Sequence, residues 1–194
     1  MRITGGEFRG RSITCPKGLA VRPTASKVRQ AFFNILGDRL RDCRFLDLFS
    51  GTGLMGFEAA SRGAAHVTFV EQNIASYKAI GESARNFGLS TSDVKVVNGD
   101  VLKVLNSAGN LQEAYDIIFV DPPYKLKLGP QVADLVCRNK LLNKGGLFIV
   151  EHMTDDPVQL SDDSLDLGLS RSDFRQYGQT ALSFFSFAES NSIA

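Results

Sequence analysis

Short apolar runs alternate with longer, partly polar segments along most of the chain. Five runs are almost entirely apolar and predict strands buried on both faces: 44–49, 66–71, 94–98, 116–121 and 146–151. Segments of helical length separate them, including 53–62 and 73–87, and another helix is expected to end near a turn at 143–146. This alternation predicts an α/β fold, in which helices cover both faces of a parallel sheet.

The two ends of the chain depart from this alternation. Residues 173–187 resemble two strands joined by a Gly-containing turn, which predicts a closing antiparallel hairpin. A mostly parallel, seven-stranded sheet that ends in such a hairpin is typical of Rossmann-like class I methyltransferases rather than of dehydrogenases. Residues 3–14 predict a small basic hairpin outside the sheet, and 24–36 predict a helix.

Length and composition restrict the class of protein. With 194 residues, 43% hydrophobic and 22% charged, the chain is expected to form one globular catalytic domain over 23–189, preceded by a basic extension over 1–22. No apolar run approaches membrane-spanning length, so no membrane anchor is expected. The three cysteines, Cys15, Cys43 and Cys137, are far apart, which argues against a zinc site and favours a reducing, cytoplasmic location. No targeting signal is apparent at the start.

The net charge of +1 conceals an asymmetry. Residues 1–30 contain seven basic residues and one acidic residue, so this segment carries +6, whereas the remainder, with 15 basic and 20 acidic residues, carries −5. A basic segment on a mildly acidic body is typical of a surface that binds phosphate backbones. The alternative is a solvated basic face with no partner.

A glycine-rich loop follows the first predicted strand. Gly51, Gly53 and Gly56 form GxGxxG, and Glu71 ends the next strand, where it is able to accept both hydrogen bonds of a ribose diol. These features predict a nucleoside site. Asp47 distinguishes the ligands, because its carboxylate would repel a pyrophosphate but suits the ammonium and sulfonium of S-adenosylmethionine.

A third acidic position follows the third predicted strand. Asp100 is placed to hydrogen-bond the adenine amino group, with Val101 against the ring. Asp is also a favoured helix N-cap, so each acidic residue of this site has an alternative role at a strand-to-helix junction.

The sequence Asp121-Pro122-Pro123-Tyr124 follows the fourth predicted strand, at the edge where open α/β sheets bind ligands. Two prolines stiffen this loop and remove two N–H donors, which leaves an array of acceptors. The Asp121 carboxylate and the Pro122 carbonyl are predicted to hold both hydrogens of an aromatic amine and so direct its lone pair toward a methyl group. Tyr124 is predicted to stack on the base. The alternative is an ordinary proline turn.

The carboxylate of Asp121 also bears on the base that is modified. Guanine presents adjacent N1–H and N2–H donors, which an acceptor-only carboxylate matches, whereas adenine presents an acceptor beside a donor. Guanine N2 is therefore the predicted target, and adenine N6 in DNA or RNA is the alternative. A nicotinamide-dependent oxidoreductase, suggested by GxGxxG with Glu71, and a noncatalytic RNA-binding factor are the remaining alternatives.

The chain resembles the RsmD family of methyltransferases that modify guanine N2 in bacterial 16S ribosomal RNA. The resemblance extends over nearly the whole chain: Ile3–Gly6, Arg9–Arg11, Arg22–Thr24, Val28–Leu36, Leu46–Ala59, Ser61–Ala64, Phe69–Glu71, Asp121–Tyr124 and Gly145–Glu151. The GG…RGR…RPT opening is more discriminating than the cofactor motifs, which many methyltransferases share. Ser50 and Met55 stand where alanine is common in the family.

This resemblance implies specific roles for the residues. Asp47, Gly51, Gly53, Glu71 and Asp100 would bind S-adenosylmethionine, and Asp121 with Tyr124 would hold the target amine. The resemblance further implies that Arg9, Arg11 and Arg22 contact RNA, and that the helix over 24–34 borders the methionine end of the cofactor. The near-neutral total charge suggests that a partly assembled small-subunit particle supplies some contacts to a monomeric enzyme.

Overall fold

The computed structural model describes residues 1–16, 26–107, 111, 113–123 and 126–188. The chain divides into two compact units, Met1–Val104 (unit 1) and Leu105–Ala194 (unit 2). The predicted division into a basic extension, 1–22, and a catalytic domain, 23–189, concerns function rather than compactness and stays a prediction.

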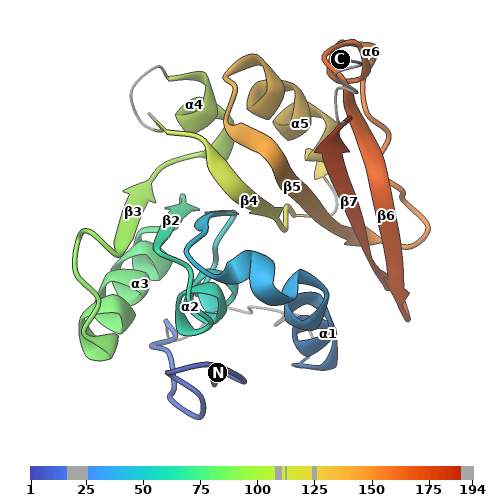
Figure 1. Ribbon diagram of the computed structural model, residues 1–194. Helices are drawn as coiled ribbons and strands as arrows, with labels where there is room; N and C mark the ends of the chain where they lie inside the picture. Colours follow the sequence, from blue (N-terminus) through green and yellow to red (C-terminus); the bar gives the residue numbers. More distant parts are fainter. Residues whose placement is uncertain (17–25, 108–110, 112, 124–125, 189–194) are drawn as a thin grey trace, which may run out of the picture. The chain divides into compact units, whose positions relative to one another are not determined.

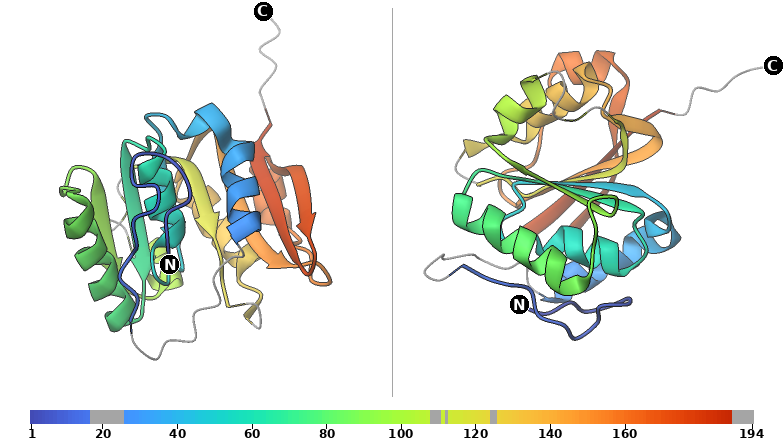
Figure 2. Two further views of the ribbon diagram at one scale, coloured as in Figure 1. Left: turned by 90° about the horizontal axis from the view of Figure 1, so that it is seen from below. Right: turned by 90° about the vertical axis from the view of Figure 1, so that its left-hand side faces the viewer.

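Unit 1 contains three parallel strands, two helices that precede them and the helices that follow β1 and β2. The elements are α1 (Ser26–Leu36), the 3-10 helix η1 (Gly37–Leu40), β1 (Arg44–Leu48), α2 (Leu54–Ser61), β2 (His66–Glu71), α3 (Ile74–Phe87) and β3 (Val94–Asn98). β2 pairs in parallel with β1 on one side and with β3 on the other. Figure 1 shows α2 and α3 side by side against these strands, and the views in Figure 2 agree.

Local sequence signals explain the ends of α3. The Asn73 side chain caps its start by accepting the N–H groups of Ala75 and Ser76 at 2.9 and 3.0 Å. Gly88 ends the helix in the left-handed conformation, at φ +77°. Both capping residues can be recognised in the sequence. The predicted helix over 73–87 is confirmed.

The first sixteen residues form a loop that packs against the rest of unit 1. An isolated antiparallel bridge joins Arg2 to Ser12, in agreement with the expected small hairpin outside the sheet. Ile3 and Ile13 are buried, and the Phe8 ring stacks on Phe87 of α3 with centroids 4.9 Å apart. The segment is therefore held by apolar contacts as well as by the bridge.

Unit 2 contains the other four strands. β4 (Tyr115–Val120) pairs in parallel with β5 (Leu142–Met153), and β7 (Thr180–Phe187) pairs antiparallel with both β5 and β6 (Leu169–Tyr177). α5 (Gly129–Arg138) packs against β5, and α6 (Asp162–Asp166) contacts α5 and β6. α4 (Val101–Asn106) spans the boundary between the units. The predicted C-terminal hairpin is thus confirmed.

One predicted boundary is wrong. The helix expected to end near 143–146 ends at Arg138, where Lys140, at φ +53°, turns the chain. Gly145 and Gly146 lie inside β5, beside a register shift between β5 and β4 at Tyr115 and Ile117. Glycines mark a strand irregularity as readily as a turn, so the glycine pair was misread as a turn.

The strands form a seven-stranded sheet in the order β3-β2-β1-β4-β5-β7-β6. The pairs β1/β2, β2/β3 and β4/β5 are parallel, and β7 is antiparallel to β5 and β6. This confirms the predicted Rossmann-like fold class. Within the described ranges, no helix has the length and apolar character needed to cross a membrane.

Candidate active site

The glycine loop follows β1 and turns sharply. Gly51 and Gly53 have left-handed φ values of +55° and +77°, which favour glycine. A Cβ added at Gly51 would meet no atom within 4 Å, whereas one added at Gly56 would lie 2.2 Å from the Phe69 ring. Gly51 therefore lies beside open space, while Gly56 allows α2 to pack closely on β2.

Glu71 is the last residue of β2, and its side chain is hydrogen-bonded to the glycine loop. Its Oε2 accepts the Gly51 N–H and its Oε1 accepts the Asn73 N–H, each at 2.7 Å. A carboxylate offers about four acceptor positions, so these two bonds leave capacity for a pair of hydroxyl donors. The structure thus brings together two residues predicted to bind the cofactor, and the remaining acceptors fit a ribose diol.

Asp47 lies within β1 and is buried, with 2% of its surface exposed. Burial raises the pKa of its carboxyl from 3.8 to about 8, and the negative charge of Glu71 adds to the rise, while the N–H of Gly56 opposes it. That N–H donates to Asp47 Oδ2 at 2.9 Å. A buried carboxyl with so high a pKa is stabilised in its charged form by a nearby cation. This fits the cationic ligand predicted from the sequence.

Asp100 and Val101 lie where β3 passes into α4. Asp100 Oδ1 accepts the Lys103 N–H at 3.0 Å, so this residue caps α4, as the alternative interpretation expected. The Val101 side chain is buried and offers an adenine ring little free surface. The Gly99 N–H donates to the Glu71 carbonyl at 3.1 Å, which holds this junction close to the end of β2. The role of Asp100 and Val101 in adenine binding stays a prediction.

The predicted amine-binding corner lies in unit 2, directly after β4. Asp121 is half-buried, Pro122 is buried, and Pro123 is exposed. The Leu126 N–H donates to the Pro123 carbonyl at 2.9 Å. Tyr124 lies outside the described residues. Asp121 and Pro122 thus follow the carboxyl end of a buried strand, as the sequence predicted.

The arginines predicted to contact RNA differ in their contacts with the rest of the protein. Arg9 is exposed. The Arg11 guanidinium lies 4.7 Å from the centroid of Phe87 and donates to the Asn86 carbonyl, so it also supports the packing of the first segment. Arg22 lies outside the described residues. RNA contact by these arginines stays a prediction.

A buried ion-pair cluster in unit 1 was missed from the sequence. Glu58 of α2 is fully buried, and its Oε1 lies 3.0 Å from Arg29 Nε of α1, while its Oε2 lies 3.3 Å from Arg62 Nε. The Thr4 N–H also donates to Glu58 Oε1, at 2.7 Å. The cluster therefore joins the first segment and α1 to α2. Glu58 and Arg62 are four residues apart, but Thr4 and Arg29 are distant in the sequence, so no local pattern marks the cluster as a whole.

Comparisons with known proteins give a consistent result. The family described as "Conserved hypothetical protein 95" matches residues 1–186. A Bacillus subtilis protein provisionally named rRNA methyltransferase YlbH is 31% identical over 95% of this chain and 98% of its own length. A Haemophilus influenzae protein named Ribosomal RNA small subunit methyltransferase D is 33% identical over 81% of each chain.

A solved structure agrees with these relatives. An Escherichia coli protein, provisionally described as the methyltransferase yhhF, superposes with a TM-score of 0.82 and 29% identity. The match covers 96% of this chain and 97% of that chain. The sequence and structural similarities therefore extend over both units.

Proposed function

Because the chain belongs to the RsmD family and is a methyltransferase, we propose that it uses S-adenosylmethionine to methylate guanine N2 in 16S ribosomal RNA. The observation that carries this proposal is the similarity to Ribosomal RNA small subunit methyltransferase D, together with an intact Asp121-Pro122 corner directly after β4. Family and fold set aside the nicotinamide-dependent oxidoreductase and the noncatalytic RNA-binding factor.

The residues of unit 1 fit the cofactor. Gly51 leaves space beside its backbone, and Glu71 keeps acceptor capacity next to that space. Asp47 is a buried carboxyl whose raised pKa favours a cationic neighbour. When bound, S-adenosylmethionine supplies an electrophilic methyl group. We assign the ribose hydroxyls to Glu71, the cationic end to Asp47, and the adenine to the Asp100–Val101 junction.

The residues of unit 2 act on the target amine. An exocyclic amine on a purine is a poor nucleophile because its lone pair is delocalised into the ring. The Asp121 carboxylate and the Pro122 carbonyl would each accept one N–H, which favours a pyramidal nitrogen with a directed lone pair. The proton that the amine gives up on methylation would pass to Asp121 or to water. Tyr124 would stack on the base and fix its distance.

The substrate is proposed to be RNA rather than a small molecule. The relatives are named for ribosomal RNA, and the first thirty residues of this chain carry a charge of +6. Arg9, Arg11 and Arg22 are proposed to contact phosphates. Because the chain as a whole carries only +1, we propose that a partly assembled small-subunit particle completes the interface. The enzyme would act there as a cytoplasmic monomer.

The test is the identity of the modified nucleoside. Ribosomal RNA from cells with and without this protein is digested, and the nucleosides are compared by mass spectrometry. Loss of N2-methylguanosine from the small-subunit RNA alone is expected. Loss of N6-methyladenosine instead would establish the alternative target, and an unchanged profile would overturn both.

A further inference from the structure

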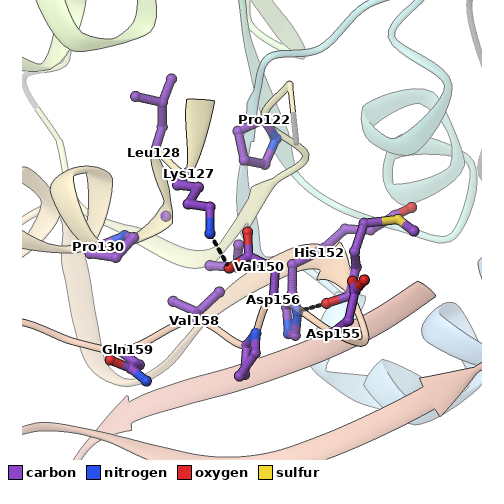
Figure 3. A pocket seen from close by; sticks show the side chains of 14 residues that line it. Pro122, Lys127, Leu128, Pro130, Val150, His152, Asp155, Asp156, Val158 and Gln159 are labelled. Atoms are coloured by element: carbon purple, nitrogen blue, oxygen red, sulfur yellow. Dashed lines mark hydrogen bonds and ion pairs between the residues drawn. The ribbon is translucent and has the colours of Figure 1, made fainter. Parts of the chain in front are cut away.

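A cavity of about 460 Å³ lies in unit 2 beside the amine-binding corner. Its lining includes Pro122, directly after β4, and Glu151 and His152 near the end of β5. Figure 3 labels Pro122 and His152 among the side chains around it. The volume falls within the range of roughly 300–1,000 Å³ that is usual for small-molecule sites. We call this cavity the β5 pocket. It adjoins the corner that holds the amine, so it has room for the rest of the nucleotide.

An ion pair joins two walls of the β5 pocket. Lys127, in the loop before α5, places its Nζ 2.9 Å from Asp156 Oδ1, in the loop after β5 (Figure 3). The Lys127 side chain remains 71% exposed. Exposed pairs of this kind contribute little to stability, so the lysine is available to exchange its carboxylate for another anion.

The backbone at Lys127 adds a second observation. Its φ of +48° is in the left-handed region, where glycine would be less strained. Non-glycine residues in this region tend to occur at ligand-binding and other functional sites. The conformation of Lys127 is consistent with such a site and adds to the observation of the ion pair.

The other groups that line the β5 pocket define what it would accept. His152 is already engaged, because its Nδ1 lies 2.8 Å from the Met153 carbonyl and its Nε2 lies 2.9 Å from Ser183 Oγ. Glu151, which is buried, and Asp155, which is exposed, also line the pocket, so its lining carries three carboxylates against the single lysine and disfavours an anion away from Lys127.

These features point to one ligand chemistry. We propose that the β5 pocket receives the target guanine nucleotide of the RNA, and that Lys127 leaves Asp156 to bind a phosphate of that nucleotide. Guanine suits a lining that includes carboxylates because its Watson–Crick edge carries donors, and enzymes that modify bases read this edge after extruding the nucleotide. Asp156 would keep Lys127 from binding other anions in the free enzyme. This inference rests on the proposed function and adds two residues to it.

The test compares Lys127→Ala, Asp156→Asn and the double variant with Lys144→Ala. Lys144 is a matched control because it is exposed and lies near the opposite end of β5. The substrate is small-subunit RNA or particles from cells lacking the protein. Methyl incorporation gives kcat and KM, and RNA binding is followed across salt concentrations.

We expect Lys127→Ala to raise KM for RNA by about threefold to tenfold and to reduce the salt slope by about 0.7 to 0.9, the value of one phosphate contact. kcat and KM for S-adenosylmethionine should be unchanged. Asp156→Asn should lower KM for RNA by about twofold to fivefold, because it frees Lys127. The double variant should match Lys127→Ala.

Three results would overturn the proposal. In the first, Lys127→Ala behaves like Lys144→Ala. In the second, Asp156→Asn raises KM as much as Lys127→Ala does, which would make the ion pair merely structural. In the third, guanosine monophosphate binds through Lys127 while KM for RNA is unaffected, which would assign the pocket to a free nucleotide. If the wild type produces another methylated nucleoside while the salt slopes shift as expected, the phosphate contact stands and the guanine assignment fails.

Discussion

The Glu71 carboxylate accepts the backbone N–H of Gly51 at 2.7 Å, although twenty positions separate the two residues. This bond fixes the conformation of the glycine loop and the direction of the carboxylate together. A ligand that binds Glu71 therefore meets a loop whose position is already set, which reduces the ordering that binding requires.

Replacing Glu71 tests this relationship. Glu71→Ala removes the bond to Gly51 and the proposed ribose acceptor, so affinity for S-adenosylhomocysteine should fall by about tenfold to a hundredfold. Isothermal titration calorimetry measures the effect. Glu82→Ala, at an exposed position of the neighbouring α3, serves as the control. Equal affinities in the two variants would exclude Glu71 from the cofactor site.

Asp47 predicts a dependence of stability on pH. Its carboxyl has a pKa of about 8 in the folded protein and an ordinary value of 3.8, so above about pH 4 the folded state retains a proton that the unfolded chain releases. Stability is therefore lost as pH rises from about 4 to about 8, by at most about 1.4 kcal/mol per pH unit. Urea unfolding of the cofactor-free protein at pH 5, 6.5 and 8 should show wild type losing stability relative to Asp47→Asn. Parallel profiles would contradict this prediction.

Asp121→Ala should stop catalysis without affecting the cofactor. Loss of the carboxylate leaves the target amine without one of its two acceptors, and misplacement at a reacting centre lowers rates by about a hundredfold or more. Single-turnover methyl transfer measures the rate, and titration with S-adenosylhomocysteine should give an unchanged affinity. A variant with full turnover would disprove the role of Asp121.

Arg9 and Arg11 should respond differently to charge reversal. Arg9→Glu should weaken RNA binding and flatten its salt dependence without changing thermal stability, because Arg9 is exposed. Arg11→Glu should also lower stability, by about 0.5 to 1 kcal/mol, because it removes the contact of the guanidinium with Phe87. Salt titrations and thermal unfolding of both variants separate the effects. Unaltered salt slopes would count against this RNA surface.

Glu58→Gln should destabilise the protein severely. The substitution leaves Arg29, only 3% exposed, beside a neutral partner, and breaking a buried pair in this way costs about 3 to 5 kcal/mol. Urea unfolding gives the difference. Glu113→Gln, at an exposed position, is the control. A loss below about 1 kcal/mol would show that solvent or a rearrangement compensates Arg29.

Much of the fold could be predicted from local pattern. The strands that became β1, β2, β3 and β4 are short apolar runs, and the ends of α3 carry the capping residues Asn73 and Gly88. The short helices α4 and α6 were not predicted, because five or six residues give too little periodicity to distinguish them from loops. The start of β5 was misplaced because Gly145 and Gly146 were read as a turn.

The candidate site could be predicted only where its residues belong to a motif. Gly51 and Glu71 were found because each follows a strand at a recognisable spacing, and the structure joins them. The pairs Glu58–Arg29 and Lys127–Asp156 were missed, since each joins distant segments and pairing of this kind depends on tertiary structure. The composition predicted the charge of the first thirty residues. It could not predict that Arg11 packs against Phe87.

The first sixteen residues are held in place against the rest of unit 1, which affects how a large substrate would be selected. Ile3, Phe8 and Ile13 are part of the apolar core, so this basic segment is a fixed edge of unit 1 rather than a flexible tether. The same unit carries Gly51 and Glu71. An RNA phosphate bound by Arg9, as we propose, would therefore lie at a set distance from the glycine loop, so the enzyme would favour RNA whose shape matches that distance.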